Sequence, residues 1–175
     1  MVGALRVERA TMDPDDPTGF HIRRRHLPQW HERGATYFVT FTLRRPSPVN
    51  LTRPDIGFMV LAALLSGDGT RYLLYDRTVM PDHVHVILKP LVEDGRVPAL
   101  SRVLGQLKGS LSREINQVLG RRGPLWQDES YTRIIRDEAE YHRKAQYIYE
   151  NPVRRDLIPD PAEWPWWGMG SGGDL

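Results

Sequence analysis

The stretch VMPDHVHVILKP, residues 79–90, is the part of the sequence from which the fold can be worked out. Its Pro81-Asp82 pair is typical of a tight connection, and the residues on either side favour strands. We therefore predict an antiparallel hairpin made of strand 71–80 and strand 83–89.

Two histidines stand one residue apart in this hairpin. Residues i and i+2 of a strand point to the same face of a sheet, so His83 and His85 are predicted side by side, with Val84 and Val86 on the opposite face. Neighbouring imidazoles form a two-point ligand for a divalent metal. Two imidazoles do not complete a metal site, and without a third ligand the pair would be ordinary histidines on an open sheet face.

Hydrophobic spacing and turn residues predict further elements around the hairpin. The last helix is expected to begin after the N-cap residue Asp137, with Glu140 three positions later, and to end at Asn151-Pro152. The order β-α-β-β-α-β-α predicts an α+β protein with helices packed on one face of an antiparallel sheet. Besides the hairpin, the predicted elements are strand 36–44, helix 55–65, helix 98–119, strand 131–136 and helix 138–150.

The length of 175 residues suits one domain with a hydrophobic core. We expect a disordered lead-in at 1–19, a single domain at 20–167 and a flexible glycine-rich tail at 168–175. The absence of cysteine excludes disulfides and thiolate chemistry and suits a cytoplasmic protein. The sequence has no apolar run of the roughly 18 residues that a membrane-spanning helix needs, and its polar start is unlike a signal peptide.

The last predicted helix places its tyrosines on different faces. At about 100° per residue, Tyr147 falls opposite the apolar arc, with Asn151 one turn later on the same side. If the helix docks across the sheet face that carries the histidines, the amide oxygen of Asn151 can be the third metal ligand, and Tyr147 lies beside the metal. The predicted buried stripe consists of Tyr141, Ala145, Ile148 and Tyr149.

This arrangement would suit chemistry on a phosphodiester. Imidazole and oxygen ligands together fit Mg²⁺ or Mn²⁺, which polarises a phosphodiester and stabilises developing charge. The hydroxyl of Tyr147 could then attack phosphorus and become covalently linked to it. A tyrosine on a polar helix face is also compatible with an ordinary surface position, so the geometry alone leaves both roles open.

Four segments, taken in order, resemble the REP-associated tyrosine transposases, part of the wider group of single-tyrosine HUH transposases. They are VMPDHVHVIL, LGQLKGSLSREINQVLGRRG, LWQDESYTRIIRDE and YHRKAQYIYENPVRRDL, and the resemblance covers about residues 21–167. It implies a ferredoxin-like sheet with flanking helices, and cleavage of single-stranded DNA near hairpins through a 5′-phosphotyrosine link. It also implies that His83 and His85 bind the metal, that Asn151 is the helical amide ligand and that Tyr147 is the nucleophile.

A single-stranded DNA partner needs cations for its phosphates and flat rings for its bases. Trp126 is compatible with stacking on a base or with filling the core, and the later tryptophans are expected to pack in the core or cap it. The candidate DNA contacts are Arg23, Arg24 and Arg25 in HIRRRH, Arg102, Lys108 and Arg113 in helix 98–119, Arg121 and Arg122 in the following loop, and Trp126, Gln127 and Asp128.

Several alternatives remain open at this point. A histidine-triad hydrolase is disfavoured, because Ile87 stands where its third strand histidine would be. The ending AEWPWWGMG departs from the family pattern W-x-x-[YF]-x-W-S, which leaves the role of this segment open. A non-catalytic regulator that binds hairpin DNA, or a domesticated remnant of a transposase, remains the alternative function. Both a monomer and a homodimer are compatible with the sequence.

Overall fold

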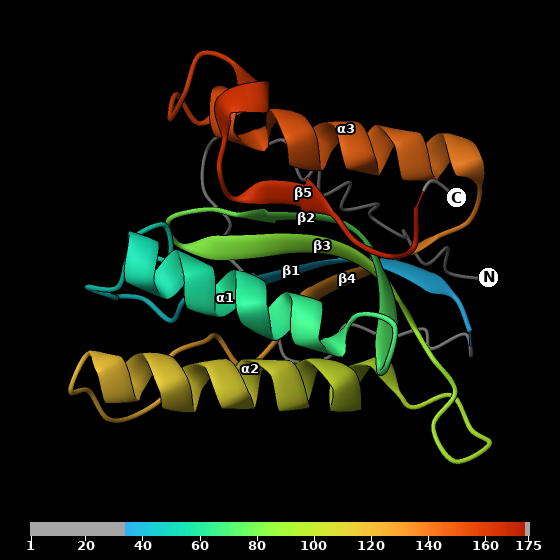
Figure 1. The fold of residues 1–175 in the computed structure, drawn as a ribbon, viewed down its shortest axis with the longest axis horizontal. Helices are drawn as coiled ribbons and strands as arrows, with labels where there is room; N and C mark the ends of the chain where they lie inside the picture. The colour runs from blue at the N-terminus through green and yellow to red at the C-terminus, as the bar shows by residue number, and fades with distance from the viewer. Residues whose placement is uncertain (1–33, 174–175) are drawn as a thin grey trace, which may run out of the picture.

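The computed structural model describes residues 34–173. A five-stranded antiparallel sheet lies between two helical layers, with α1 and α2 on one face and α3 on the other (Figure 1). None of the helices in the described part is long and apolar enough to span a membrane. The elements are β1 (Thr36–Thr42), α1 (Pro54–Gly67), β2 (Tyr72–Val79), β3 (His83–Pro90), α2 (Leu100–Val118), β4 (Tyr131–Ile135), α3 (Glu138–Arg154), the short 3₁₀ helix η1 (Pro161–Glu163) and β5 (Trp167–Met169).

The strand order β4-β1-β3-β2-β5 follows from the way the helices connect the strands. From β1 to β4, the chain has the β-α-β-β-α-β connection of ferredoxin-like folds, in which β1 and β3 form the centre of the sheet. The predicted α+β class and ferredoxin-like sheet are therefore confirmed. The predicted hairpin is present as β2 and β3, which pair antiparallel around the Pro81-Asp82 turn.

The helices cover both faces of the sheet, and the expectation that they share one face is wrong. The side chains of β3 alternate between the faces, and both sets are buried: Val84 and Val86 belong to one core, while His83 and His85 lie under α3. The element order alone does not say which face a helix covers, whereas the resemblance implies helices on both sides of the sheet, as observed. Aromatic and aliphatic neighbours on the histidine face make it suitable for a third helix.

Two apolar cores lie on opposite sides of the sheet. The larger is formed with α1 and α2, and the α2 side chains in it have the three- and four-residue spacing that predicted this helix: Leu100, Val103, Leu104, Leu107, Leu111 and Ile115. The smaller core fixes α3 on the sheet. It contains Phe38, Tyr75, Ile87 and Ile135 from the strands, with Tyr141 and Ile148 from α3.

The ends of α3 differ in how well the sequence predicts them. The Asp137 carboxylate accepts a hydrogen bond from the backbone N–H of Glu140 at 2.7 Å, so the expected N-cap is confirmed. At the other end, the helix continues through Pro152 to Arg154, so the expected stop at Asn151-Pro152 is wrong. Proline removes one backbone hydrogen bond, and this close to the C-terminus the helix continues for the remaining half turn.

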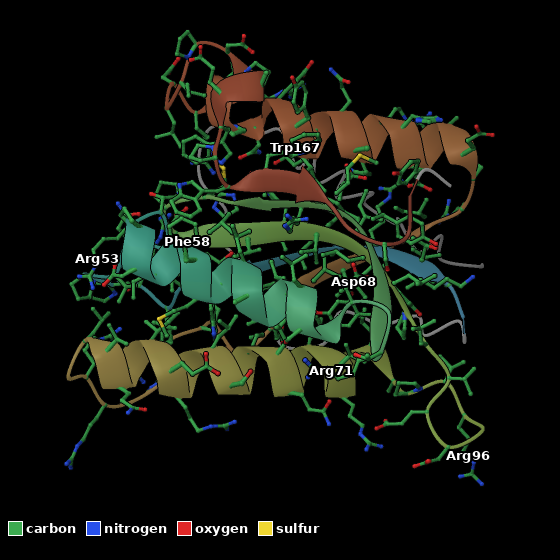
Figure 2. All side chains as sticks on the ribbon, in the orientation of Figure 1. Arg53, Phe58, Asp68, Arg71, Arg96 and Trp167 are labelled. Carbon is green, nitrogen blue, oxygen red and sulfur yellow. The ribbon has the colours of Figure 1, made fainter. Side chains whose placement is uncertain are left out.

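The C-terminal residues are held against β2, in contrast to the flexible tail expected from residue 168 onward. Beyond the pairing of β5, the N–H of Gly170 donates to the carbonyl of Tyr75 at 2.8 Å, and that of Gly172 to the carbonyl of Leu74 at 2.8 Å. Glycine permits this approach, since a Cβ on Gly170 would lie 2.5 Å from the Leu74 carbonyl oxygen. Figure 2 shows Trp167 between β5 and α3, where its ring meets that of Tyr149 at 4.9 Å between centroids.

Two helix glycines should respond oppositely to replacement by alanine. A Cβ on Gly57 in α1 would lie 2.5 Å from the Trp166 ring, whereas one on Gly105 in α2 would meet no atom within 4 Å. We expect Gly57→Ala to lower the free energy of unfolding by about 1–3 kcal/mol through overpacking. Gly105→Ala should raise it by about 0.5–1 kcal/mol, since alanine is the better helix former. Urea denaturation measures both values, and a stabilising Gly57→Ala would contradict the packing of Trp166 on α1.

Candidate active site

The two histidines of β3 face each other beneath α3. The Nε2 atoms of His83 and His85 are 3.1 Å apart, and the two residues are 6% and 4% exposed. Two neighbouring ligands of a six-coordinate ion, each about 2.1 Å from it, are separated by about 3 Å. The spacing of the two nitrogens thus suits two ligands of one metal ion.

Each outer ring nitrogen has a polar partner from the sheet or its turn. Nδ1 of His83 lies 2.6 Å from a carboxylate oxygen of Asp82, and Nδ1 of His85 lies 2.7 Å from Oγ1 of Thr40. Because a carboxylate only accepts hydrogen bonds, Nδ1 of His83 is assigned the proton, which leaves the lone pair of neutral His83 on Nε2. Such partners commonly fix the orientation of metal-binding histidines.

The pKa values of Asp82 and His85, on either side of His83, are both lowered, but for different reasons. The hydrogen bond from His83 holds the pKa of the Asp82 carboxyl well below its usual range, with a further contribution from Arg45. Burial lowers the pKa of His85 well below its ordinary value, and the positive charges of Arg155 and Lys144 lower it further. His85 is therefore a neutral imidazole, which is the form that binds a metal.

The contacts of α3 fix the direction in which it crosses the sheet. The Nζ atom of Lys144 lies 5.0 Å from the ring centroid of Phe38, and the Tyr147 ring lies 6.0 Å from Phe38 and 5.2 Å from His85. Increasing residue number along α3 thus runs from Phe38 towards His85. The next residue on this side of the helix is Asn151, which lies one turn further along α3 in the same direction.

The side-chain amide oxygen of Asn151 is buried without a hydrogen-bond partner in the described part of the chain. The residue is 3% exposed, and the unpartnered atom is Oδ1. A buried, unpartnered carbonyl oxygen is costly, and a cation would relieve that cost. The described residues contain no group of three or more His, Cys, Asp or Glu side chains that could hold a metal. A site at the histidine pair therefore depends on an amide oxygen, and the donor set fits a metal that accepts nitrogen and oxygen ligands.

The two tyrosines near the end of α3 differ from the wheel prediction in one respect. Tyr147 is separated from Tyr149 as predicted, but it faces the sheet and is half-buried against the small core. Tyr149 was expected in the buried stripe and is also only half-buried, with Trp167 as its ring partner. Both arcs of the helix pack on protein, so of the two positions left open for Tyr147, docking on the histidine face is the one the structure has.

The candidate DNA contacts are dispersed. Arg23, Arg24 and Arg25 lie outside the described residues. Trp126 is 4% exposed, lies edge-on to Phe41 and donates from Nε1 to the Lys108 carbonyl, so of its two possible roles the structure supports filling the core. The remaining candidates are at or near the surface, exposed for Arg102, Arg113, Arg122 and Asp128 and half-buried for Lys108, Arg121 and Gln127. A cleft of about 350 Å³ between α2 and residues 124–132 includes Lys108 and Gln127 in its lining.

Sequence reasoning missed four residues around the histidines. Asp82 could have been inferred from its position directly before His83, whereas Thr40 comes from another strand and requires the sheet register. Lys144 and Arg155 influence His85 from α3. Their spacing from Tyr147 and Asn151, three to four residues, is the signal that could have identified them.

No family model matches the chain. Sequence comparison finds relatives in one class of protein, the REP-associated tyrosine transposases, and confirms the resemblance that the motifs indicate. One relative, from Haemophilus influenzae, is 26% identical over 94 residues, which cover 50% of this chain and 53% of that protein. The REP-associated tyrosine transposase of Escherichia coli K12 is 24% identical over 139 residues, which cover 78% of each chain.

The fold has a counterpart among solved structures. The structure of a REP-associated tyrosine transposase bound to a REP hairpin is similar to this chain with a TM-score of 0.61 and 21% identity, over 85% of this chain and 82% of that one. This similarity confirms the fold. The chain spans about half the length of the Haemophilus influenzae relative and most of the other two proteins.

Removal of one imidazole should weaken metal binding. We expect His83→Ala to lower the affinity for Mn²⁺ by about tenfold or more, because one of the three predicted ligands is removed. The matched control is His142→Ala, since His142 is exposed on α3 and interacts with Glu138. Isothermal titration calorimetry measures both, and equal Mn²⁺ affinity of wild type and His83→Ala would exclude a metal at this pair.

Lys108 should contribute to stability. Its Nζ donates to the carbonyls of Gln127 and Asp128 and to the hydroxyl of Ser130, at 2.8, 3.2 and 3.2 Å. We expect Lys108→Met to lower the free energy of unfolding by about 1–3 kcal/mol, because these acceptors lose their donor. Arg113→Met, at an exposed position of the same helix, should change it by less than about 0.5 kcal/mol in urea denaturation. Equal stability of the two variants would contradict the structural role of Lys108.

Proposed function

We propose that the protein is a metal-dependent single-stranded DNA endonuclease and transposase that cleaves and rejoins DNA near hairpin repeats. The observation that carries the proposal is the Tyr147 ring against His85, 5.2 Å between centroids, on the side of α3 that also buries the unpartnered oxygen of Asn151. We assign to this site a nucleophile and an amide oxygen from α3 and two imidazoles from β3. Together they make up the groups that a tyrosine nuclease requires.

The chemistry assigned to Tyr147 is transfer of a phosphoryl group to its phenol. Its Oη forms a bond to phosphorus while the bond from phosphorus to the 3′ oxygen breaks, and the departing oxygen takes up a proton as the phenol loses one. The products are a 5′-phosphotyrosine and a free 3′-hydroxyl. Because the phosphotyrosine keeps the energy of the phosphodiester, attack by a 3′-hydroxyl reverses the step and rejoins a strand.

His83, His85 and Asn151 are the residues that would hold Mg²⁺ or Mn²⁺. The bound ion would neutralise charge that develops on the phosphate. The protein's own contribution is orientation, since Asp82 and Thr40 fix the two rings and α3 fixes Asn151. The packing of Tyr147 between Phe38 and His85 limits the positions of its hydroxyl.

The proposed DNA partner rests on the relatives. Both relatives are assigned to the REP-associated tyrosine transposases, and the solved structure of similar fold holds a REP hairpin. Hairpin repeats that flank the gene of this protein are therefore the substrates to test first. Exposed arginines of α2 and the loop after it are suited to contact phosphates.

The central test is the formation of a covalent adduct. Labelled single-stranded hairpin oligonucleotides are incubated with the protein and Mn²⁺ or Mg²⁺ and separated on a denaturing gel. Wild type and Tyr149→Phe should form an SDS-resistant adduct, whereas Tyr147→Phe should form none and still bind the hairpin. Metal-independent binding by wild type without an adduct would overturn the nuclease proposal and identify a hairpin-binding regulator. An adduct lost only in Tyr149→Phe would assign the nucleophile to the other tyrosine.

A further inference from the structure

Lys144 carries a positive charge to the side of Tyr147 that is remote from Asn151. Its Nζ lies 5.0 Å from the ring centroid of Phe38 and 5.6 Å from that of Tyr147. The residue is half-buried. The lysine therefore extends along the underside of α3 towards the sheet.

The charges around Tyr147 are predominantly positive. Arg154 places its guanidinium carbon 5.7 Å from the Tyr147 ring, and Lys144 lies on the other side of that ring along α3. The acidic groups nearby already interact with cations or histidine: Asp82 with Arg45 and His83, and Glu150 with Arg154. Such a surface attracts an anion, and in a DNA strand the anion is the phosphate.

Lys144 is better placed than Arg154 to contact that anion. The side chain of Arg154 is 47% exposed, whereas Lys144 is half-buried. Lys144 sits over the two aromatic rings that border the candidate site. Along α3 it stands one turn before Tyr147, while Asn151 stands one turn after it, so the tyrosine lies between the lysine and the metal ligands.

We propose that Lys144 is a catalytic residue whose ammonium binds a non-bridging oxygen of the phosphate that Tyr147 attacks. This inference rests on the proposed function. The cation–π contacts hold the ammonium beside the nucleophile before DNA arrives, so its charge is in place when phosphorus is attacked. The opposing explanation is that Lys144 only stabilises the packing of α3 on Phe38.

A substrate that lacks the charge separates these two roles. The cleavage position is first mapped with wild type, and an oligonucleotide with a neutral methylphosphonate at that position is prepared. On native DNA, Lys144→Met should slow adduct formation by about 10- to 100-fold, the scale of a lost charge-assisted hydrogen bond. On the methylphosphonate the difference between Lys144→Met and wild type should shrink to less than about threefold, because there is no longer a negative charge to neutralise.

Two further variants control for charge and packing. Lys144→Arg keeps the cation and should retain most of the rate. Arg143→Met removes the same charge from an exposed position of α3 and should react like wild type on both substrates. Thermal unfolding of Lys144→Met shows whether the helix remains docked, and a slow variant that unfolds at the wild-type temperature supports the catalytic role.

Binding gives a readout that does not depend on cleavage. In the Tyr147→Phe background, replacing the native phosphate by methylphosphonate should weaken binding when Lys144 is present. In the double variant that also carries Lys144→Met, the same replacement should change Kd by less than about half the fold-change seen with Lys144 present. Fluorescence anisotropy measures the four affinities.

The failures of the two proposals are distinguishable. No adduct with wild type on native DNA means that the proposed function fails. An adduct with wild type, together with a Lys144→Met variant that is equally slow on both substrates or as fast as wild type on native DNA, overturns the role of Lys144 alone.

Discussion

The packing of α3 across the sheet is the constraint on which the candidate site depends. Tyr141 and Ile148 enter the small core beside Phe38 and Ile87, and the Tyr141 hydroxyl donates to Asp76 at 2.9 Å. With these contacts in place, the helical repeat alone determines where the intervening side chains fall. Tyr147 must meet His85, and Asn151 must be buried beyond it. The apolar contacts thus position groups of quite different chemistry.

The histidine face combines two opposed requirements. Burial of apolar side chains stabilises the packing of α3 on the sheet. The same burial places imidazoles, threonines and an amide in a poorly solvated layer. The structure meets part of the cost by pairing His83 with Asp82 and His85 with Thr40. Oδ1 of Asn151 has no such partner among residues 34–173. A cation at the pair would complete the polar interactions of this layer.

Much of the fold follows from short-range patterns in the sequence. The apolar spacing of α2, the N-cap at Asp137 and the hairpin turn before His83 depend on residues close in the chain, and the structure has all three. Alternation along β3 also places the histidines on one face. The partner of His85 could not be predicted, because Thr40 becomes its neighbour only through the register between β1 and β3.

The errors arose where one local pattern is compatible with two environments. The helical wheel separates Tyr147 from Tyr149, but it does not say that both arcs contact protein. A lysine on the polar face of a helix can bind a DNA phosphate or a protein carbonyl, and Lys108 binds the carbonyls of the following loop. A loop tryptophan is likewise compatible with a base or a core, and Phe41 is the partner of Trp126. Tertiary packing decides each of these cases.

The alternating glycines after Trp167 have a consequence for how the sheet ends. Because Gly168, Gly170 and Gly172 let the chain lie against β2, the peptide groups of that strand are matched with partners from within the same molecule. A protein cut before Trp167 would leave this row of donors and acceptors bare, and bare strand edges are templates for joining sheets between molecules. The last residues thus cover the β2 edge and disfavour the pairing of this strand with a strand of another molecule.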